Sequence, residues 1–182
     1  MHQVRTLKIL IGSLCKLIAL SFATFALFVG VLSSGAGEVF AAELNLHVEL
    51  NPVGSFIGKS SKVKGSVKKK DGAYSAKNIE LELDSLKSGI SLRDKHMKEK
   101  YFETKKYPEA KLQKATGKGG KFSGILMIRK IKKKISGKYE VDGSTLKFEF
   151  KTKLSDFKIK EAAYMGVGVV DEVKVTGELP IE

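Results

Sequence analysis

The sequence of 182 residues contains no tryptophan, three prolines, three histidines and a single cysteine, Cys15. Residues 42–182 have no cysteine, so a domain there cannot rely on disulfides and must be stabilised by buried side chains. This part of the chain has only two histidines, His47 and His96, and no glycine-rich loop that opens a helix. Zinc and haem sites need clustered ligands, and a nucleophile needs a base nearby. We therefore expect no metal, no cofactor and no catalytic residues.

The length fits one globular domain with an appendage, and the net charge is +13. Residues 42–182 contain 30 basic and 19 acidic residues, and only Arg93 and Arg129 among the basic ones are arginines. Lysine is a hydrated point charge that reads bases poorly, so this composition favours solubility, or attraction to an anionic surface such as a membrane, over nucleic-acid recognition. We expect no nucleic-acid partner.

The first 41 residues are typical of a cleavable signal peptide. Arg5, Lys8 and Lys16 precede an uncharged stretch, residues 17–37, and the small-residue pattern Val39-Phe40-Ala41 follows it. This order predicts cleavage after Ala41 or Ala42. An uncleaved anchor is the alternative, because about 20 apolar residues can span a bilayer. The predicted organisation is a signal peptide at 1–41 and one domain at 42–182.

The predicted domain shows the alternation of apolar and polar residues that is typical of antiparallel strands with one buried face. Turns of the Asp-Gly type separate the strands at Asp71-Gly72 and Asp142-Gly143. We count about eight strands. A single closed antiparallel barrel satisfies this count best because closure removes the edge strands, and a two-sheet sandwich is the alternative. The clearest segments are residues 44–50, 79–83, 122–128, 146–154 and 169–179.

One short helix is expected near residues 92–101. Ser91-Leu92-Arg93-Asp94 has the Ser-x-x-Asp spacing of a capping box, and Tyr107-Pro108 excludes helix further on. We expect Asp94 to cap the backbone of Ser91, with ligand contact as the alternative. His96 is predicted either to be partly buried with a partner or to make a polar contact at a cavity mouth.

The lysine-rich stretch from Lys130 to Ile135 has two interpretations. Its isoleucines are four positions apart in a β context, so it is predicted to be a solvated hairpin bend. A contact with anionic lipids is the alternative. His47 lies on the polar face of the first strand and is expected to face solvent.

Several motifs together resemble the YceI-like family. Leu83-Asp84-Ser85-Leu86, Arg93-Asp94-Lys95-His96, Tyr101-Phe102 and Tyr107-Pro108 occur in the family's order. Gly124-Ile125-Leu126-Met127-Ile128 is similar to its Gly-x-Leu-Thr-Ile strand, and Leu154-Ser155-Asp156-Phe157 and residues 168–175 are similar to its C-terminal pattern. The resemblance covers nearly all of residues 44–179.

The resemblance implies a lipocalin-like, eight-stranded barrel in the bacterial periplasm that binds polyisoprenoids or similar amphiphiles along its axis. It implies polar residues beside the entrance and an apolar set that lines the cavity, although composition alone cannot separate such a lining from an ordinary core. The expected ligand-binding residues are Arg93, Asp94, His96, Phe102, Phe122, Leu126, Ile128, Phe148, Phe150 and Phe157. Two departures are Lys130–Ile135, where the family usually has Gly-Val-Thr-x-Pro-Val, and Tyr101, where phenylalanine is usual.

The expected function is non-catalytic binding of a polyisoprenoid, quinone, prenyl lipid or fatty amide for transport or storage in the envelope. Burial of each CH₂ group of such a chain contributes about 0.8 kcal/mol. The main alternative is an extracytoplasmic stress or interaction protein with a filled barrel and a working basic surface. An enzyme that acts on the bound amphiphile through Asp94 or His96 is the third hypothesis. A homodimer is also compatible with the sequence.

Overall fold

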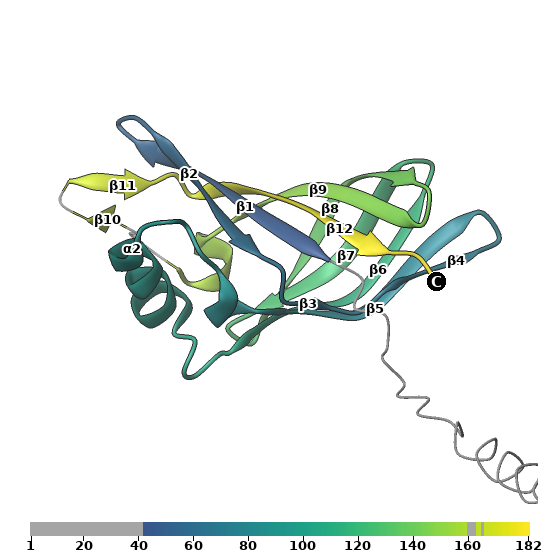
Figure 1. Cartoon of the computed structure of the whole chain (residues 1–182), viewed down its shortest axis with the longest axis horizontal. Coiled ribbons are helices and arrows are strands. Elements are labelled where there is room, and N and C mark those ends of the chain that lie inside the picture. Colours follow the sequence, from purple (N-terminus) through teal and green to yellow (C-terminus); the bar gives the residue numbers. More distant parts are fainter. Residues whose placement is uncertain (1–41, 160–162, 165) are drawn as a thin grey trace, which may run out of the picture. The chain divides into compact units, whose positions relative to one another are not determined.

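The computed structural model describes residues 42–159, 163–164 and 166–182 (Figure 1). The predicted signal peptide at 1–41 lies outside the described residues. Within the described ranges, no helix combines the length and the apolar composition that crossing a bilayer requires.

The described domain is built almost entirely from strands, which confirms the predicted all-β class. Twelve strands are present in the described residues: β1 (Glu43–Asn51), β2 (Ser55–Ser60), β3 (Val63–Lys64), β4 (Val67–Lys70), β5 (Ala73–Glu82), β6 (Glu109–Lys118), β7 (Lys121–Ile128), β8 (Ile131–Asp142), β9 (Thr145–Lys153), β10 (Ala163–Tyr164), β11 (Val167–Val169) and β12 (Glu172–Pro180). The helical segments are η1 (Leu83–Ser85), α2 (Ser91–His96), η2 (Met97–Phe102) and η3 (Ser155–Phe157).

The strands form one sheet that curls into a nearly closed antiparallel barrel (Figure 1). The main path runs β10-β11-β1-β12-β9-β8-β7-β6-β5-β3, while β2 pairs with β1 and β4 pairs with β5. The chain from β2 to β4 therefore passes from one edge of the sheet to the other. Near the C-terminus, Val67 and Ile181 form a parallel bridge, and the Glu182 amide donates to the Val67 carbonyl at 2.8 Å. These contacts bring the edges of the curled sheet together.

The predicted count of eight strands is wrong, because the structure contains additional short strands. Residues 55–70 form three separate pieces, β2, β3 and β4. Gly65 interrupts them with φ of 113°, a conformation that favours glycine. The residues after the helical region also add two short strands, β10 and β11. Alternation of residue types does not reveal such breaks, because it does not show that β2 pairs with β1 while β3 and β4 pair with β5.

The predicted helix is present, and its capping differs from the prediction. α2 covers Ser91–His96, and the chain then widens into the single-turn π-helix η2. Ile90 occupies the N-cap position with no side-chain hydrogen bond, so Ser91 and Asp94 do not form the predicted capping box. Asp94 is buried and accepts from the backbone and hydroxyl of Ser88 instead.

The predicted bend over Lys130–Ile135 is also wrong. The reversal is confined to Arg129 and Lys130, whose φ angles are 51° and 64°, and Ile128 pairs directly with Ile131. Positive φ at both central residues matches the twist of a two-residue hairpin. The lysines that follow therefore belong to the regular strand β8.

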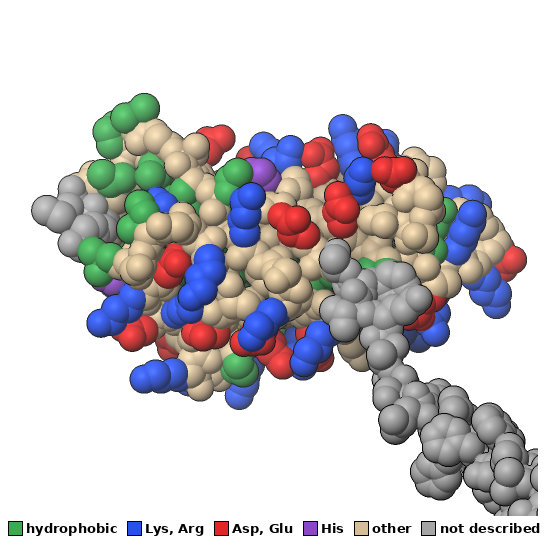
Figure 2. All heavy atoms as spheres, viewed as in Figure 1, with side chains coloured by type: hydrophobic (Ala, Val, Ile, Leu, Met, Phe, Trp, Pro, Cys, Tyr) green, Lys and Arg blue, Asp and Glu red, His purple; other side chains and the backbone are tan. Residues whose placement is uncertain are grey.

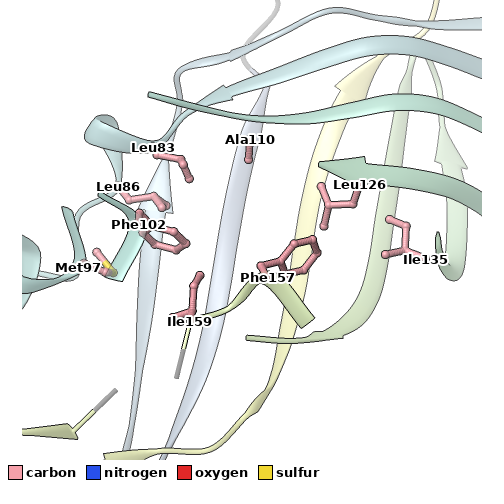
Figure 3. Packing of buried hydrophobic residues seen from close by; sticks show 9 residues of the cluster. All are labelled: Leu83, Leu86, Met97, Phe102, Ala110, Leu126, Ile135, Phe157 and Ile159. Atoms are coloured by element: carbon pink, nitrogen blue, oxygen red, sulfur yellow. The ribbon is translucent and has the colours of Figure 1, made fainter. Parts of the chain in front are cut away.

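Buried side chains form two adjoining clusters inside the barrel. The first lies beside the helical segment, where Phe157 points toward Leu126 and Ile135, and Phe102 lies beside Leu86 and Met97 (Figure 3). The second contains Val67, Ala76, Ile79, Ala115, Tyr139, Leu146 and Leu179. The two clusters adjoin at Leu112 and Phe122, which pack against both.

Candidate functional site

An inner cavity of about 140 Å³ lies within the barrel. Its walls are almost wholly apolar and come mainly from nine strands, β1, β3 to β9 and β12. Among its lining residues are Leu44, Leu46, Ile79, Leu81, Phe102, Leu112, Phe122, Leu126, Ile128, Tyr139, Phe148, Phe150 and Val175. A wall of this kind binds hydrocarbon without directional preference.

Three phenylalanines form one aromatic wall of the inner cavity. The rings of Phe122 and Phe150 meet edge to face with centroids 6.2 Å apart, and Phe148 stacks on Phe150 at the same distance. Glycines lie opposite these rings in the sheet: Gly137 pairs with both Phe122 and Phe150, and Gly177 pairs with Phe148. Because glycine has no side chain, the phenylalanine rings can occupy the space beside Gly137 and Gly177.

Replacing Gly137 by alanine is expected to destabilise the barrel and disturb this wall. A Cβ atom there would clash most closely with the Glu149 carbonyl oxygen, and would lie 2.6 Å from Phe122 Cε1 and 2.8 Å from Phe150 Cβ, so the β9 backbone and the Phe122 ring would both have to move. Overpacking of this kind costs about 1–3 kcal/mol, which urea unfolding would measure. Gly168→Ala is the matched control, because its Cβ would meet nothing within 4 Å. Equal stability of the two variants would contradict this account.

A second, larger space, the outer pocket, has a volume of about 340 Å³ and opens beside α2. Its lining is again mainly apolar. It includes Leu46, Val48, Leu50, Phe56, Ile90, Leu92, Arg93, His96, Met97, Tyr101, Phe102, Leu154, Ile159, Val167, Val169 and Val173. Its volume lies within the range of about 300–1,000 Å³ that is usual for ligand pockets, whereas the inner cavity is smaller.

The two spaces meet at Leu46 and Phe102, which line both. Phe102 is buried and ends η2, the π-helical turn that follows α2. Met97 and Leu86 pack beside its ring (Figure 3). A long chain could reach from the outer pocket into the inner cavity only by passing these two side chains, so their positions decide the length of ligand that fits.

Arg93 and Asp94 hold the turn that precedes α2. Asp94 accepts hydrogen bonds from the amide and hydroxyl of Ser88 at 2.7 and 2.6 Å. Arg93 donates to the Ser88 hydroxyl at 2.8 Å, and its guanidinium lies 4.0 Å from the centre of the Phe56 ring. The pair thus fixes the turn against β2, and Arg93 alone of the two also lines the outer pocket.

The structure distributes the residues expected from the sequence over three environments. Phe122, Leu126, Ile128, Phe148 and Phe150 line the inner cavity, and Phe102 lines both spaces. Arg93 and His96 line the outer pocket. Asp94 and Phe157 line neither space: the first is bound to Ser88, and the second is fully buried in the core.

Sequence reasoning missed the contribution of the first and last long strands. Leu46, Val48 and Leu50 on β1, and Val173 on β12, line the outer pocket. Their inward parity was visible in the alternation. Alternation does not show that β1 and β12 are neighbours in the sheet. It also does not show that residues of α2 line the same pocket.

The η3 turn is anchored from outside by Asp171. The Ser155 amide and hydroxyl both donate to its carboxylate, at 2.8 and 2.7 Å. These two hydrogen bonds hold the pKa of Asp171 below its usual value, and the bond from the Ser155 hydroxyl has the larger effect. The anchored turn carries Phe157 into the core.

Lysines on the outside of the barrel form ion pairs with neighbouring carboxylates. On β9 and β12, lysines alternate with carboxylates in ion pairs such as Lys151–Glu172 and Lys174–Glu149, both at 2.7 Å. On β6, Lys111 lies between Glu80 and Glu109, whose hydrogen bonds raise its pKa to about 12. Among the described residues, no group of three or more histidine, aspartate or glutamate side chains could hold a metal ion.

Comparison with known families decides what kind of barrel this is. The model of the YceI-like domain matches residues 42–180. The chain belongs to the YceI-like family. The match spans the whole described barrel, from the residue before β1 to the end of β12.

Solved structures confirm the fold of this YceI-like domain. BcnA from Burkholderia cenocepacia is similar with a TM-score of 0.61 and 20% identity, over 78% of this chain and 97% of that one. A polyisoprenoid-binding domain from Saccharophagus degradans, described as implicated in plant cell wall breakdown, is similar with a TM-score of 0.53 and 15% identity, over 76% and 92%. No curated protein matches the sequence.

Proposed function

We propose that this YceI-like protein binds a polyisoprenoid or a similar long-chain amphiphile, without catalysis, for transport or storage in the bacterial envelope. The observation that carries the proposal is the pair of adjoining apolar spaces that share Leu46 and Phe102. A linear hydrocarbon would occupy the outer pocket first and extend into the inner cavity when Phe102 turns aside.

The size of the two spaces limits the ligand. The inner cavity of about 140 Å³ is too small for a drug-sized molecule by itself, so the chain must also fill the outer pocket of about 340 Å³. The polar head would remain near Arg93 and His96, the polar side chains that line the outer pocket from α2. This orientation places the apolar tail innermost, where hydrophobic transfer is most favourable.

The envelope location rests on the sequence of residues 1–41, whose basic start, uncharged stretch and Val39-Phe40-Ala41 favour export and cleavage. The alternative function, a filled barrel with a working basic surface, needs no apolar space. The inner cavity and outer pocket favour lipid binding over it.

Organic extraction of the protein purified after export, followed by mass spectrometry, tests the proposal. We expect about one amphiphile with a long hydrocarbon chain per protein molecule. Intact mass in the same experiment identifies the first residue and so tests cleavage. Delipidated protein should then take up geranylgeraniol as well in high salt as in low salt, because apolar contacts are not screened. An extract without lipid, together with no uptake of geranylgeraniol, would overturn the proposal.

A further inference from the structure

Large hydrophobic side chains are exposed around the opening of the outer pocket. Val53 is 81% exposed at the turn between β1 and β2, Ile90 is 54% exposed before α2, and Leu92 is 48% exposed on α2. Val167 on β11 is the fourth. We call these four side chains the apolar rim. Hydrophobic side chains gather over the β1–β2 hairpin, β11 and α2 in Figure 2, at the end of the domain that Figure 1 labels with these elements.

The apolar rim is continuous with the pocket. Ile90, Leu92 and Val167 each line the outer pocket while remaining exposed to water on their other side. Val53 lies on the same hairpin as Leu50, a lining residue whose amide donates to the Gly54 carbonyl at 2.9 Å. Exposed apolar groups around an opening are typical of an interaction site.

We infer that the apolar rim inserts into the interfacial layer of a phospholipid bilayer, so that the amphiphile passes between membrane and pocket without crossing water. This inference rests on the proposed function. The amphiphiles proposed as ligands are membrane lipids, and each CH₂ group that crosses water on the way costs about 0.8 kcal/mol. An opening pressed against the bilayer avoids that cost.

Charge and shape favour a bilayer over a second copy of the chain. Residues 42–182 carry 30 basic and 19 acidic residues, so two copies repel each other, whereas anionic lipids attract the domain. The helical segment of residues 91–102 alone has four basic and two acidic residues. The apolar rim also comes from three separate segments around a hollow. Such a broken surface suits a fluid layer better than a flat protein face.

The test compares the binding of ligand-free protein to vesicles with its uptake of geranylgeraniol in the absence of vesicles. Val53→Ser removes an apolar side chain that does not line the pocket, so it should lower the vesicle-bound fraction several-fold and leave uptake unchanged. Adding Ile90→Ser should bring the loss to about tenfold. Val141→Ser is the matched control, because Val141 is 43% exposed and lines neither space. It should bind vesicles as the unaltered protein does.

Vesicles of phosphatidylcholine alone and vesicles that also contain phosphatidylglycerol distinguish apolar insertion from electrostatic attraction. We expect binding to both, with a gain from the anionic lipid that salt removes. Uptake of geranylgeraniol without binding to either vesicle would overturn the inference and leave the proposed function standing. Equal binding by the rim variants and Val141→Ser would overturn it too, as would binding that high salt abolishes. A rim variant that only converts a dimer to a monomer would assign the surface to a second copy.

Discussion

Replacing Leu126 by tryptophan is expected to lower the affinity for geranylgeraniol by about tenfold or more. Leu126 on β7 lines the inner cavity and lies beside Phe157 (Figure 3). The indole would fill much of a space of about 140 Å³. Excluding even about two CH₂ groups of the ligand costs roughly 1.6 kcal/mol, which corresponds to about a tenfold loss.

The adjacent residue supplies the control for this prediction. Ile125 faces outward and is exposed, so Ile125→Trp should change neither uptake nor stability appreciably. Leu126→Trp itself should cost about 1–3 kcal/mol of unfolding free energy, because the cavity absorbs only part of the larger ring. Titration with labelled geranylgeraniol and urea unfolding measure the two effects. Unchanged uptake by Leu126→Trp would show that the chain does not enter the inner cavity.

Replacing Phe157 by alanine is expected to destabilise the protein by about 3–5 kcal/mol. Phe157 is 0% exposed and packs with Leu126 and Ile135 in the first core cluster (Figure 3). Its removal leaves a hole that the anchored η3 turn cannot close, since Asp171 holds Ser155 in place. Thermal or urea unfolding checks the loss.

Phe148→Ala provides the contrast, because the same side chain is removed from a different environment. Phe148 is only partly buried and borders the inner cavity, so fewer contacts are lost and the space already exists. We expect a smaller loss of stability and a measurable change in ligand affinity. Similar losses of stability in both variants would mean that Phe157 is no more important to the core than a cavity wall.

These two phenylalanines show where sequence reasoning stops. Both were expected from the sequence to bind ligand, and only the structure separates them: Phe148 lines the inner cavity, and Phe157 does not. A buried wall and a buried core require the same residue types. Whether an inward side chain lines the cavity or fills the core depends on its neighbours. Phe148 lies beside Gly177, which has no side chain, whereas Phe157 packs with Leu126 and Ile135.

Arg93 and Asp94 illustrate the same limit for polar residues. The spacing of Ser91 and Asp94 predicts a capping box, yet Asp94 accepts hydrogen bonds from Ser88, which lies in the turn before the helix. A local motif identifies possible donors and acceptors within reach. It does not show which of them the surrounding packing brings closest. Here Arg93 stacks on Phe56 and donates to the Ser88 hydroxyl, which holds Ser88 close to Asp94.

By itself, the sequence determined the β class, the inward faces of the long strands, the short helix near residues 92–101 and the family, because parity and local spacing survive any choice of strand partners. Tertiary structure alone decided the breaks in residues 55–70, the neighbours of each strand and the hollow interior. Hollow space is a property of side chains that meet across the barrel, so it depends on contacts between β1, β12 and α2 that lie far apart in the chain.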